Sequence, residues 1–380
     1  MNLKAMEKLE QMKEVNMSAI KQAKDQGGKV VGMYCLYSPA EIAVAAGAIP
    51  VGLCGTKNEP IAAAEQTLPR NLCPLIKSSY GFAATDTCPY LHFADLLIAD
   101  TTCDGKKKMF ELLGKIKPIA VLQLPQNQDV ETALPYWYVQ VKKLKERMEQ
   151  DFNVEITDEK LAAAIKLMNR ERKALKDLQD TAQSNPSPIT GMEMLYIMHN
   201  VGFFADKEAG IQLVNEITAE IKARAAKGET PLSPKAPRIL LAGVPVGVGS
   251  DKVVKIIEEC GGNVTCFESC GAYKKTFTID ESKEPLMAIA EQYLQTPCSV
   301  MSPNTGRLDL LTRMIKDFSI DGVIDLTWQG CHTYNIESFS VKQYIQEKHN
   351  IPFMQIETDY SESDTEQLKV RIEAFLEMLG

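Results

Sequence analysis

The chain has 380 residues, of which 45% are hydrophobic and 24% are charged, and its formal net charge at pH 7 is −8. A chain of this length exceeds the size at which one hydrophobic core keeps growing, so we expect two domains. The acidic balance argues against a nucleic-acid partner or an anionic membrane surface, because both select for clustered Lys and Arg.

The first part of the chain predicts a leading helix and then alternating strands and helices. Residues 1–24 form a charged amphipathic pattern without the apolar core of a signal peptide, and no apolar run is long enough to span a bilayer, so a cytoplasmic protein is expected. Helical patterns separate the predicted strands, which is typical of βαβ units in a doubly wound parallel sheet. The four predicted strands are Lys29–Cys35, Ala48–Cys54, Asp95–Asp100 and Pro118–Pro125.

A helix start signal follows the first predicted strand. Ser38 would cap the helix, Pro39 would occupy its first position, and Glu41 would complete a capping box three residues after the cap. Gly47 would end the helix. Because the capping box already accounts for Glu41, we assign it no catalytic role.

The middle of the chain is mostly helical, from about residue 132 to residue 227, with an interruption at SNPSPITG (184–191). The segment KGETPLSPKAPR (227–238) is typical of a linker. Strands and helices then alternate again through RILLAGVPVGVGSDKVVKIIEECGG, NVTCFESC, DGVIDLTWQGC and PFMQIETDYS. The pattern predicts an α/β fold with domains at 1–130 and 237–380, joined by a helical insertion and linker at 131–236.

The sequence contains ten cysteines but only four histidines and no C-x-x-C spacing. Disulfides are not expected in a reducing compartment, and the paired spacings of a zinc site are missing. Buried structural thiols, reactive thiols and iron–sulfur ligands remain as alternatives.

The positions of the cysteines favour a ligand role for most of them. Open α/β sheets bind ligands at the carboxyl ends of their strands, and Cys73 and Cys88 each precede a proline, as at a helix N-cap. Burial without a ligand role is the favoured interpretation for Cys260 and Cys266, inside a predicted helix and strand, and for Cys54. The cysteines at or just beyond predicted strand ends are Cys35, Cys54, Cys103, Cys270 and Cys331.

Several longer motifs resemble the 2-hydroxyacyl-CoA dehydratase superfamily, and most closely its branch of anaerobic reductases that contain a double-cubane cluster. These are YCLYSPAEIAVAAGAIP, RNLCPLIKSSYGFAATDTCPY, TTCDGKKKMFE, MSPNTGR, QGCHTYNIES and IPFMQIETDYSESDTEQL. The resemblance implies two Rossmann-like domains with iron–sulfur chemistry in the cleft between them. It also implies a homodimer.

The resemblance further implies which cysteines hold the iron. The dehydratase motifs for one four-iron four-sulfur cluster match Cys73, Cys103 and Cys331 in this chain. A double-cubane cluster, with eight irons and nine sulfurs, needs a second set of three. Cys35 and Cys270 are the first choices for it, and the third position stays open between Cys88 and Cys298.

Three other features have alternative interpretations. The lysines at 106–108 favour a solvated helix face, although a position near an anionic cluster is possible. GVPVGVGS (243–250) lacks the G-x-G-x-x-G spacing and favours a tight turn between a strand and a helix over a dinucleotide site. His332, beside Cys331, could donate a proton to substrate or a hydrogen bond to a cluster sulfur.

The chain contains no G-x-x-x-x-G-K-[ST] loop, although the family it resembles depends on electrons injected with ATP hydrolysis. The resemblance therefore implies a separate ATP-hydrolysing iron–sulfur reductase as partner. The expected function is the catalytic component of such a two-component reductase, acting on a small molecule. The alternatives are a subunit of a 2-hydroxyacyl-CoA dehydratase and a non-catalytic iron–sulfur or scaffold protein. No motif identifies the substrate or a catalytic residue.

Overall fold

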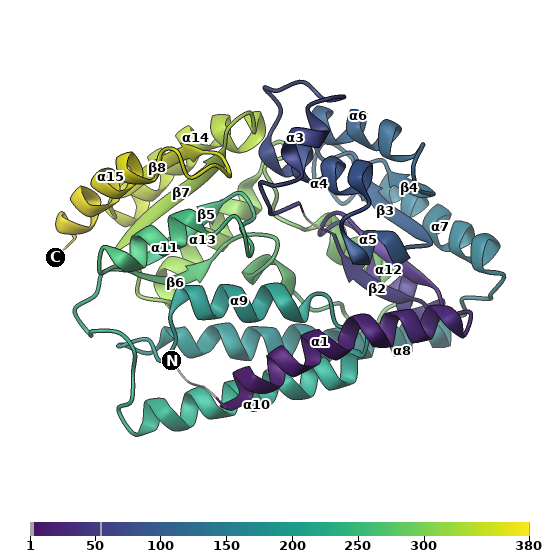
Figure 1. The fold of residues 1–380 in the computed structure, drawn as a ribbon, viewed down its shortest axis with the longest axis horizontal. Coiled ribbons are helices and arrows are strands. Elements are labelled where there is room, and N and C mark those ends of the chain that lie inside the picture. The colour runs from purple at the N-terminus through teal and green to yellow at the C-terminus, as the bar shows by residue number, and fades with distance from the viewer. Residues whose placement is uncertain (1–3, 54, 380) are drawn as a thin grey trace.

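The structure is a computed structural model that describes residues 4–53 and 55–379. It confirms the predicted α/β fold, with two four-stranded parallel sheets in two Rossmann-like halves (Figure 1). The first sheet contains β1 (Val30–Met33), β2 (Ile49–Gly52), β3 (Leu96–Asp100) and β4 (Ile119–Leu122). The second contains β5 (Arg238–Gly243), β6 (Asn263–Phe267), β7 (Gly322–Trp328) and β8 (Phe353–Thr358). The predicted strand end at Cys54 lies outside the described residues.

Both sheets have the same strand order. It is β2-β1-β3-β4 in the first sheet and β6-β5-β7-β8 in the second, and every neighbouring pair is parallel. Each sheet therefore reverses its direction of winding between its two central strands, β1 and β3 or β5 and β7. In open α/β sheets the crevice beyond the carboxyl ends of such a pair is where ligands bind.

Helices cover both faces of each sheet. Successive side chains of a strand point to opposite faces, so one strand contributes to the apolar packing on both of them. In β3, Leu97 and Ala99 join one apolar core, while Leu96 and Ile98 join another. The helices of the first half are α2 (Ala40–Ala45), α3 (Ile61–Ala64), α4 (Pro74–Thr85), α5 (Pro89–Phe93), α6 (Asp104–Leu113) and α7 (Ala133–Phe152). Those of the second half are α11 (Lys252–Glu259), η2 (Tyr273–Thr276), α12 (Pro285–Leu294), α13 (Thr305–Asp317), α14 (His332–His349) and α15 (Thr365–Glu377).

The middle of the chain is helical, as predicted, and its helices run together with the N-terminal helix along one side of the molecule (Figure 1). They are α1 (Lys4–Asp25), α8 (Asp158–Gln179), η1 (Asp180–Gln183), α9 (Gly191–Val201) and α10 (Lys207–Ala226). None of the helices in the described part of the chain is long and apolar enough to cross a membrane.

The predicted capping box at the start of α2 is wrong. The N-cap residue is Pro39, and the Ser38 hydroxyl has no hydrogen-bond partner among the described residues. Glu41 is fully buried and accepts hydrogen bonds from Arg172 Nη2 (2.6 Å) and Tyr293 Oη (2.9 Å). A buried carboxylate requires such partners, so Glu41 joins α2 to α8 and α12 instead of capping its own helix. Gly47 follows the end of α2 with a φ of 74°, as expected of a helix stop.

Helix α12 belongs to the second half of the sequence but packs in the first half of the molecule. It packs beside α7, and Ile289 and Leu294 lie in the core that contains Trp137 of α7. The Tyr37 hydroxyl donates a hydrogen bond to the Thr296 carbonyl (3.0 Å). The chain thus returns to the first sheet after β6 and crosses back before β7.

Candidate functional site

The carboxyl ends of the two sheets face a shared cavity of about 1280 Å³, which we call the outer cavity. Its lining comes from the loops that follow β1, β3 and β4 in the first sheet and β5, β6 and β7 in the second. Both pairs of central strands therefore end at the same cavity. Six cysteines line it: Cys35, Cys73, Cys103, Cys270, Cys298 and Cys331.

Cys73, Cys103 and Cys331 share one local geometry, because each is the N-cap residue of a helix. Proline follows Cys73 at the first position of α4, as predicted. The Cys103 Sγ accepts a hydrogen bond from the Lys106 amide (3.4 Å). Free amide groups and the helix dipole at such positions favour a negative sulfur.

A glycine holds two of these loops together. Gly330 has a φ of 77°, and a Cβ on it would lie 2.7 Å from the Asn71 carbonyl oxygen and 3.1 Å from the Cys73 nitrogen. No larger residue fits this contact, which brings Cys331 of the second sheet against Cys73 of the first.

These three thiols also influence one another electrostatically. Burial raises the pKa of Cys73 to about 12, and repulsion from the thiolates of Cys331 and Cys103 contributes to the rise. Burial likewise raises the pKa of Cys331 to about 11. The protein alone therefore disfavours three thiolates here, and a cationic metal group would reverse that preference.

A second set of three thiols consists of Cys35, Cys270 and Cys298. Burial raises the pKa of Cys35 well above its usual value, with further contributions from the nearby Asp100, Cys270 and Cys298. Cys298 is buried, and its raised pKa is partly offset by Lys274. Cys298 therefore lies near Cys35 and Cys270, and it also lies near enough to Cys331 to contribute to the raised pKa of that thiol.

Cys88 lies elsewhere. It is the N-cap residue of α5, as predicted, but it does not line the outer cavity, and its thiol lies near Lys57 and Asp86. Cys266 is buried in β6 and Cys260 is the C-cap residue of α11, so neither reaches the outer cavity.

The six thiols of the outer cavity are the residues in this site that could hold a metal cofactor. In the described ranges no three Cys, His, Asp or Glu side chains are close enough to hold one metal ion. An iron–sulfur cluster asks less of its ligands, because each thiolate binds a different iron at a corner of the cluster. Six thiols in two sets around one large cavity match that requirement.

The lysines at 106–108 do not share one environment. One of them fits the predicted solvated helix face, and another lies near the thiols. Lys108 is exposed and pairs with Glu111 at 2.6 Å, as expected of a solvated face. Lys106 turns inward, where its Nζ donates to the Tyr34 carbonyl oxygen (3.3 Å) and its charge opposes the raised pKa values of Cys35 and Cys298. His332 lines the outer cavity and is exposed.

A buried charge network behind Cys270 was not predicted from the sequence. The fully buried Arg307 donates to Glu268 from Nε (2.8 Å) and Nη2 (2.9 Å), and Lys274 Nζ lies 2.5 Å from the same carboxylate. Burial alone would raise the pKa of Glu268, but the two cations outweigh it and hold the pKa at about 2. The sequence signals for this network are weak. They are Glu268 in FESC, directly after a predicted strand, and the two lysines in AYKKT a few residues later.

Two Rossmann-like halves that present six thiols to one cavity at their strand ends define a class of protein with a cysteine-lined centre between paired α/β sheets. A model of the family described as 2-hydroxyglutaryl-CoA dehydratase, D-component, matches residues 35–379. The chain belongs to this family, which confirms the superfamily expected from its motifs.

Three curated relatives show the range of activities named for similar proteins. The chain is 43% identical to the putative dehydratase subunit YjiM of Escherichia coli (strain K12), over 97% of this chain and 96% of that protein. It is 28% identical to the (R)-phenyllactyl-CoA dehydratase beta subunit of Clostridium sporogenes, over 95% and 94%. It is 24% identical to a benzoyl-CoA reductase subunit of Thauera aromatica, over 56% of each chain. Dehydratases and a reductase thus both occur among the relatives.

Proposed function

We propose that this protein is the iron–sulfur component of an ATP-dependent two-component reductase that carries a double-cubane cluster of eight irons and nine sulfurs. One cubane would be held by Cys73, Cys103 and Cys331, and the other by Cys35, Cys270 and Cys298. The observation that carries the proposal is the presence of two sets of three thiols around one cavity. A single cubane would leave one set without a ligand role.

The remaining residues of the site would adapt the protein to an anionic group. Lys106 and Lys274 place positive charge near the second set of thiols, and Arg307 with Glu268 fixes the position of Lys274. When bound, the cluster would supply low-potential electrons one at a time to a small molecule. The chain's own part is to hold the cluster, to balance its charge and to limit access to it.

The partner in this proposal is a separate iron–sulfur protein that hydrolyses ATP. The sequence of this chain has no phosphate-binding loop of the Walker type. A Cβ on Gly243, the last residue of β5, would lie 2.1 Å from the Leu326 carbonyl oxygen, so this glycine is accounted for by close packing of β5 against β7. The relatives named as subunits support a multi-component system. A homodimer of this chain remains part of the proposal.

A second function is favoured by the names of the relatives. Two of them are named as dehydratase subunits, and a 2-hydroxyacyl-CoA dehydratase would need only one four-iron cluster in each chain. In that case the second set of thiols would have no metal, and the outer cavity would receive an acyl-CoA.

Iron and sulfide analysis of anaerobically purified protein separates the two functions. The proposal predicts about eight irons per chain, while the dehydratase alternative predicts about four. A chain that carries no iron when expressed anaerobically with an intact cluster-assembly system would contradict both.

Activity is tested by reconstitution with the reductase partner. We expect ATP hydrolysis to be coupled to the reduction of small acceptors without a CoA group, and we expect the isolated chain to hydrolyse no ATP. Dehydration of a 2-hydroxyacyl-CoA with about four irons per chain would replace the reductase proposal with the dehydratase one. ATPase activity of the isolated chain would contradict the two-component scheme.

A further inference from the structure

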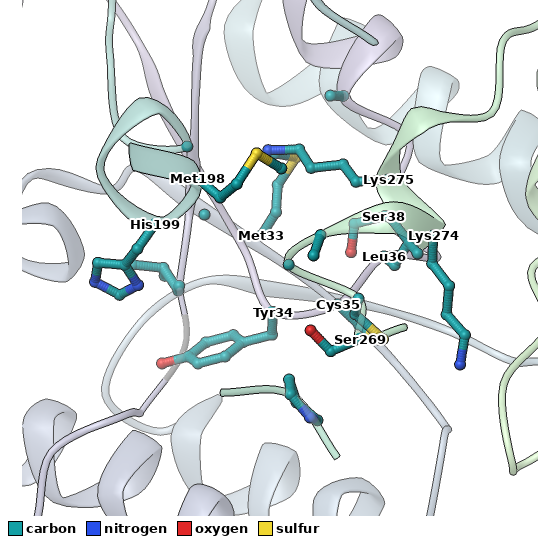
Figure 2. Close-up of a pocket in the computed structure, with 18 of the residues that line it drawn as sticks. Met33, Tyr34, Cys35, Leu36, Ser38, Met198, His199, Ser269, Lys274 and Lys275 are labelled. Atoms are coloured by element: carbon teal, nitrogen blue, oxygen red, sulfur yellow. The ribbon is translucent and has the colours of Figure 1, made fainter. Parts of the chain in front are cut away.

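A second, smaller cavity of about 240 Å³, which we call the inner cavity, lies next to the second set of thiols (Figure 2). Its wall comes from the loop between β1 and α2, the end of β2, helix α9 and the segment around η2. Five residues line both cavities and form the boundary between them: Cys35, Leu75, Lys106, Pro245 and Cys270. A molecule in the inner cavity would therefore lie beside two of the proposed cluster ligands.

The charged side chains in this wall already have partners of opposite charge. Three ion pairs account for three of the cations: Arg172 with Glu41, Lys207 with Glu171 and Lys274 with Glu268. Burial alone would raise the pKa of Glu171, but Lys207 and Lys275 outweigh it and lower the pKa. Lys106 acts on Asp100 and on the second set of thiols. An ionic ligand would have to compete with these partners for each cation.

The proposed cluster would disfavour an anion further. A thiolate-ligated iron–sulfur cluster carries net negative charge, and Cys35 and Cys270 would hold it at the boundary of the inner cavity. Like charges repel most strongly in buried surroundings, where the effective dielectric constant is low. A cation would meet the ammonium groups of the wall instead. A neutral ligand avoids both kinds of repulsion.

The rest of the wall is mostly apolar. Met33, Leu195, Met198 and Phe203 are among the residues that line it, and Figure 2 shows the two methionines together on one side, with Tyr34 on the other. An apolar cavity of about 150 Å³ is large enough to bind benzene. The inner cavity is smaller than the roughly 300–1,000 Å³ of pockets for drug-sized ligands. Its size therefore suits a molecule built on one six-membered ring.

One hydroxyl group offers a polar contact inside this space. Ser269 is 3% exposed, and its hydroxyl has no hydrogen-bond partner in the part of the chain that the structure describes. Figure 2 shows this hydroxyl beside Cys35 and directed into the cavity. A buried hydroxyl without a partner costs free energy, so a ligand with a hydroxyl or carbonyl group of its own would gain a hydrogen bond there. His199, also in the wall, is neutral at pH 7, because burial lowers its pKa to about 4.

We infer that the inner cavity binds a neutral molecule built on a single six-membered ring, with its apolar body against Met33, Met198 and Phe203 and one hydroxyl or carbonyl group at Ser269. That this ligand is the molecule reduced rests on the proposed function, and so does the repulsion of anions by the cluster. The apolar volume, the paired charges of the wall and the Ser269 hydroxyl do not depend on that function.

Calorimetry on anaerobically purified, cluster-loaded protein tests the inference with three probes. Benzyl alcohol is the neutral ligand, benzoate is its anionic match, and toluene lacks the hydrogen-bonding group. We expect benzyl alcohol to bind at least about 10-fold more tightly than benzoate, which must lose its hydration, and about 3-fold more tightly than toluene. Ser269→Ala should remove the preference over toluene and leave toluene binding unchanged.

A glycine in the wall provides a variant that fills the cavity. A Cβ on Gly52, the last residue of β2, would lie 3.9 Å from the Gly202 carbonyl oxygen, which leaves room for a side chain at this position. Gly52→Leu should therefore weaken the binding of benzyl alcohol by at least about 10-fold, because the leucine occupies the ligand's space. Gly306→Leu adds the same side chain on α13, outside the inner cavity, and should leave the binding unchanged.

Crystals of the loaded protein soaked with 4-bromobenzyl alcohol locate the site independently of affinity. An anomalous bromine peak enclosed by Met33, Met198 and Phe203 would support the inference. Benzoate binding as tight as that of benzyl alcohol, benzyl alcohol binding that survives Gly52→Leu in a folded variant, or a bromine peak only outside this cavity would overturn it. Iron content measured on the same samples reports on the proposed cluster separately, so failure of one proposal is distinguishable from failure of the other.

Discussion

Cys298 and Cys88 form a matched pair for testing the ligand assignment, since only Cys298 faces the outer cavity. We expect Cys298→Ser to lose up to about half of the iron, because one cubane would lack a ligand, and Cys88→Ser to keep all of it. Anaerobic iron and sulfide analysis with EPR spectroscopy measures the difference. Cys266→Ser, buried in β6, controls for the loss of a thiol in a core. Full iron in Cys298→Ser together with iron loss in Cys88→Ser would reverse the assignment.

His199 gives the protein a predictable sensitivity to acid. Its pKa in the folded state, about 4, lies below the ordinary 6.5, so the unfolded chain binds a proton first as the pH falls. Stability contributed by the neutral imidazole is therefore complete above pH 6.5 and is lost progressively as the pH falls toward 4. At 1.36 kcal/mol per pKa unit, the loss is about 2–3 kcal/mol.

Chemical denaturation at pH 7 and pH 4.5 checks this prediction. His199→Phe, which keeps an aromatic ring beside Phe203, should lose less stability than the wild type over that interval. His92→Asn, which removes an exposed imidazole, controls for the loss of a histidine at another position. The same acid-induced loss in His199→Phe and wild type would refute the role assigned to His199.

At the scale of elements, the buried pair of Glu41 and Arg172 joins three helices from distant parts of the chain. Arg172→Met should destabilise the protein by about 3 kcal/mol, because it leaves the Glu41 carboxylate buried without its cation. Arg170→Met is a matched control two residues earlier on α8, where the pair with Glu208 is exposed, and it should destabilise the protein much less than Arg172→Met. Urea denaturation of both variants compares them directly, and similar midpoints would contradict the prediction.

This pair also shows where local sequence patterns stop being informative. The strands could be predicted because short apolar runs between helical patterns identify buried parallel strands without knowledge of their partners. Ser38, Pro39 and Glu41 have the spacing of a capping box, but the partners of Glu41 lie 131 and 252 residues away. A local pattern cannot reveal a competing partner at that distance.

The same limit of local sequence patterns applies to the candidate site. Cys35, Cys103 and Cys331 could be placed at the strand ends from the local pattern alone, and they line the outer cavity. Cys88 and Cys298 could not be distinguished, because Cys88 has the same proline-preceding position as Cys73. The position of Cys298 depends on the path of α12, which packs against the first sheet's core. The Arg307 network was missed for the same reason, since its members come from three segments.

At the scale of the whole molecule, the two sheets repeat one strand order and turn the ends of their central strands toward each other. Each sheet alone would offer an open crevice at its switch point, as single doubly wound sheets do. Facing one another, they enclose a cavity that takes thiols from both. Cluster ligation in the proposed arrangement therefore depends on the relative position of the two sheets.

The path of α12 determines how the protein can be divided. Fragments 1–232 and 233–380, cut within the linker, would separate α12 from the core that it completes around Trp137. We expect neither fragment to fold alone, and the co-expressed pair to reassemble by fragment complementation, which gel filtration and circular dichroism would detect. A cooperative thermal transition in isolated 1–232 would contradict this. Helix α12 comes from the later half of the chain and completes the core of the first sheet, so the cavity lined by six thiols can be complete only after that later half has been synthesised.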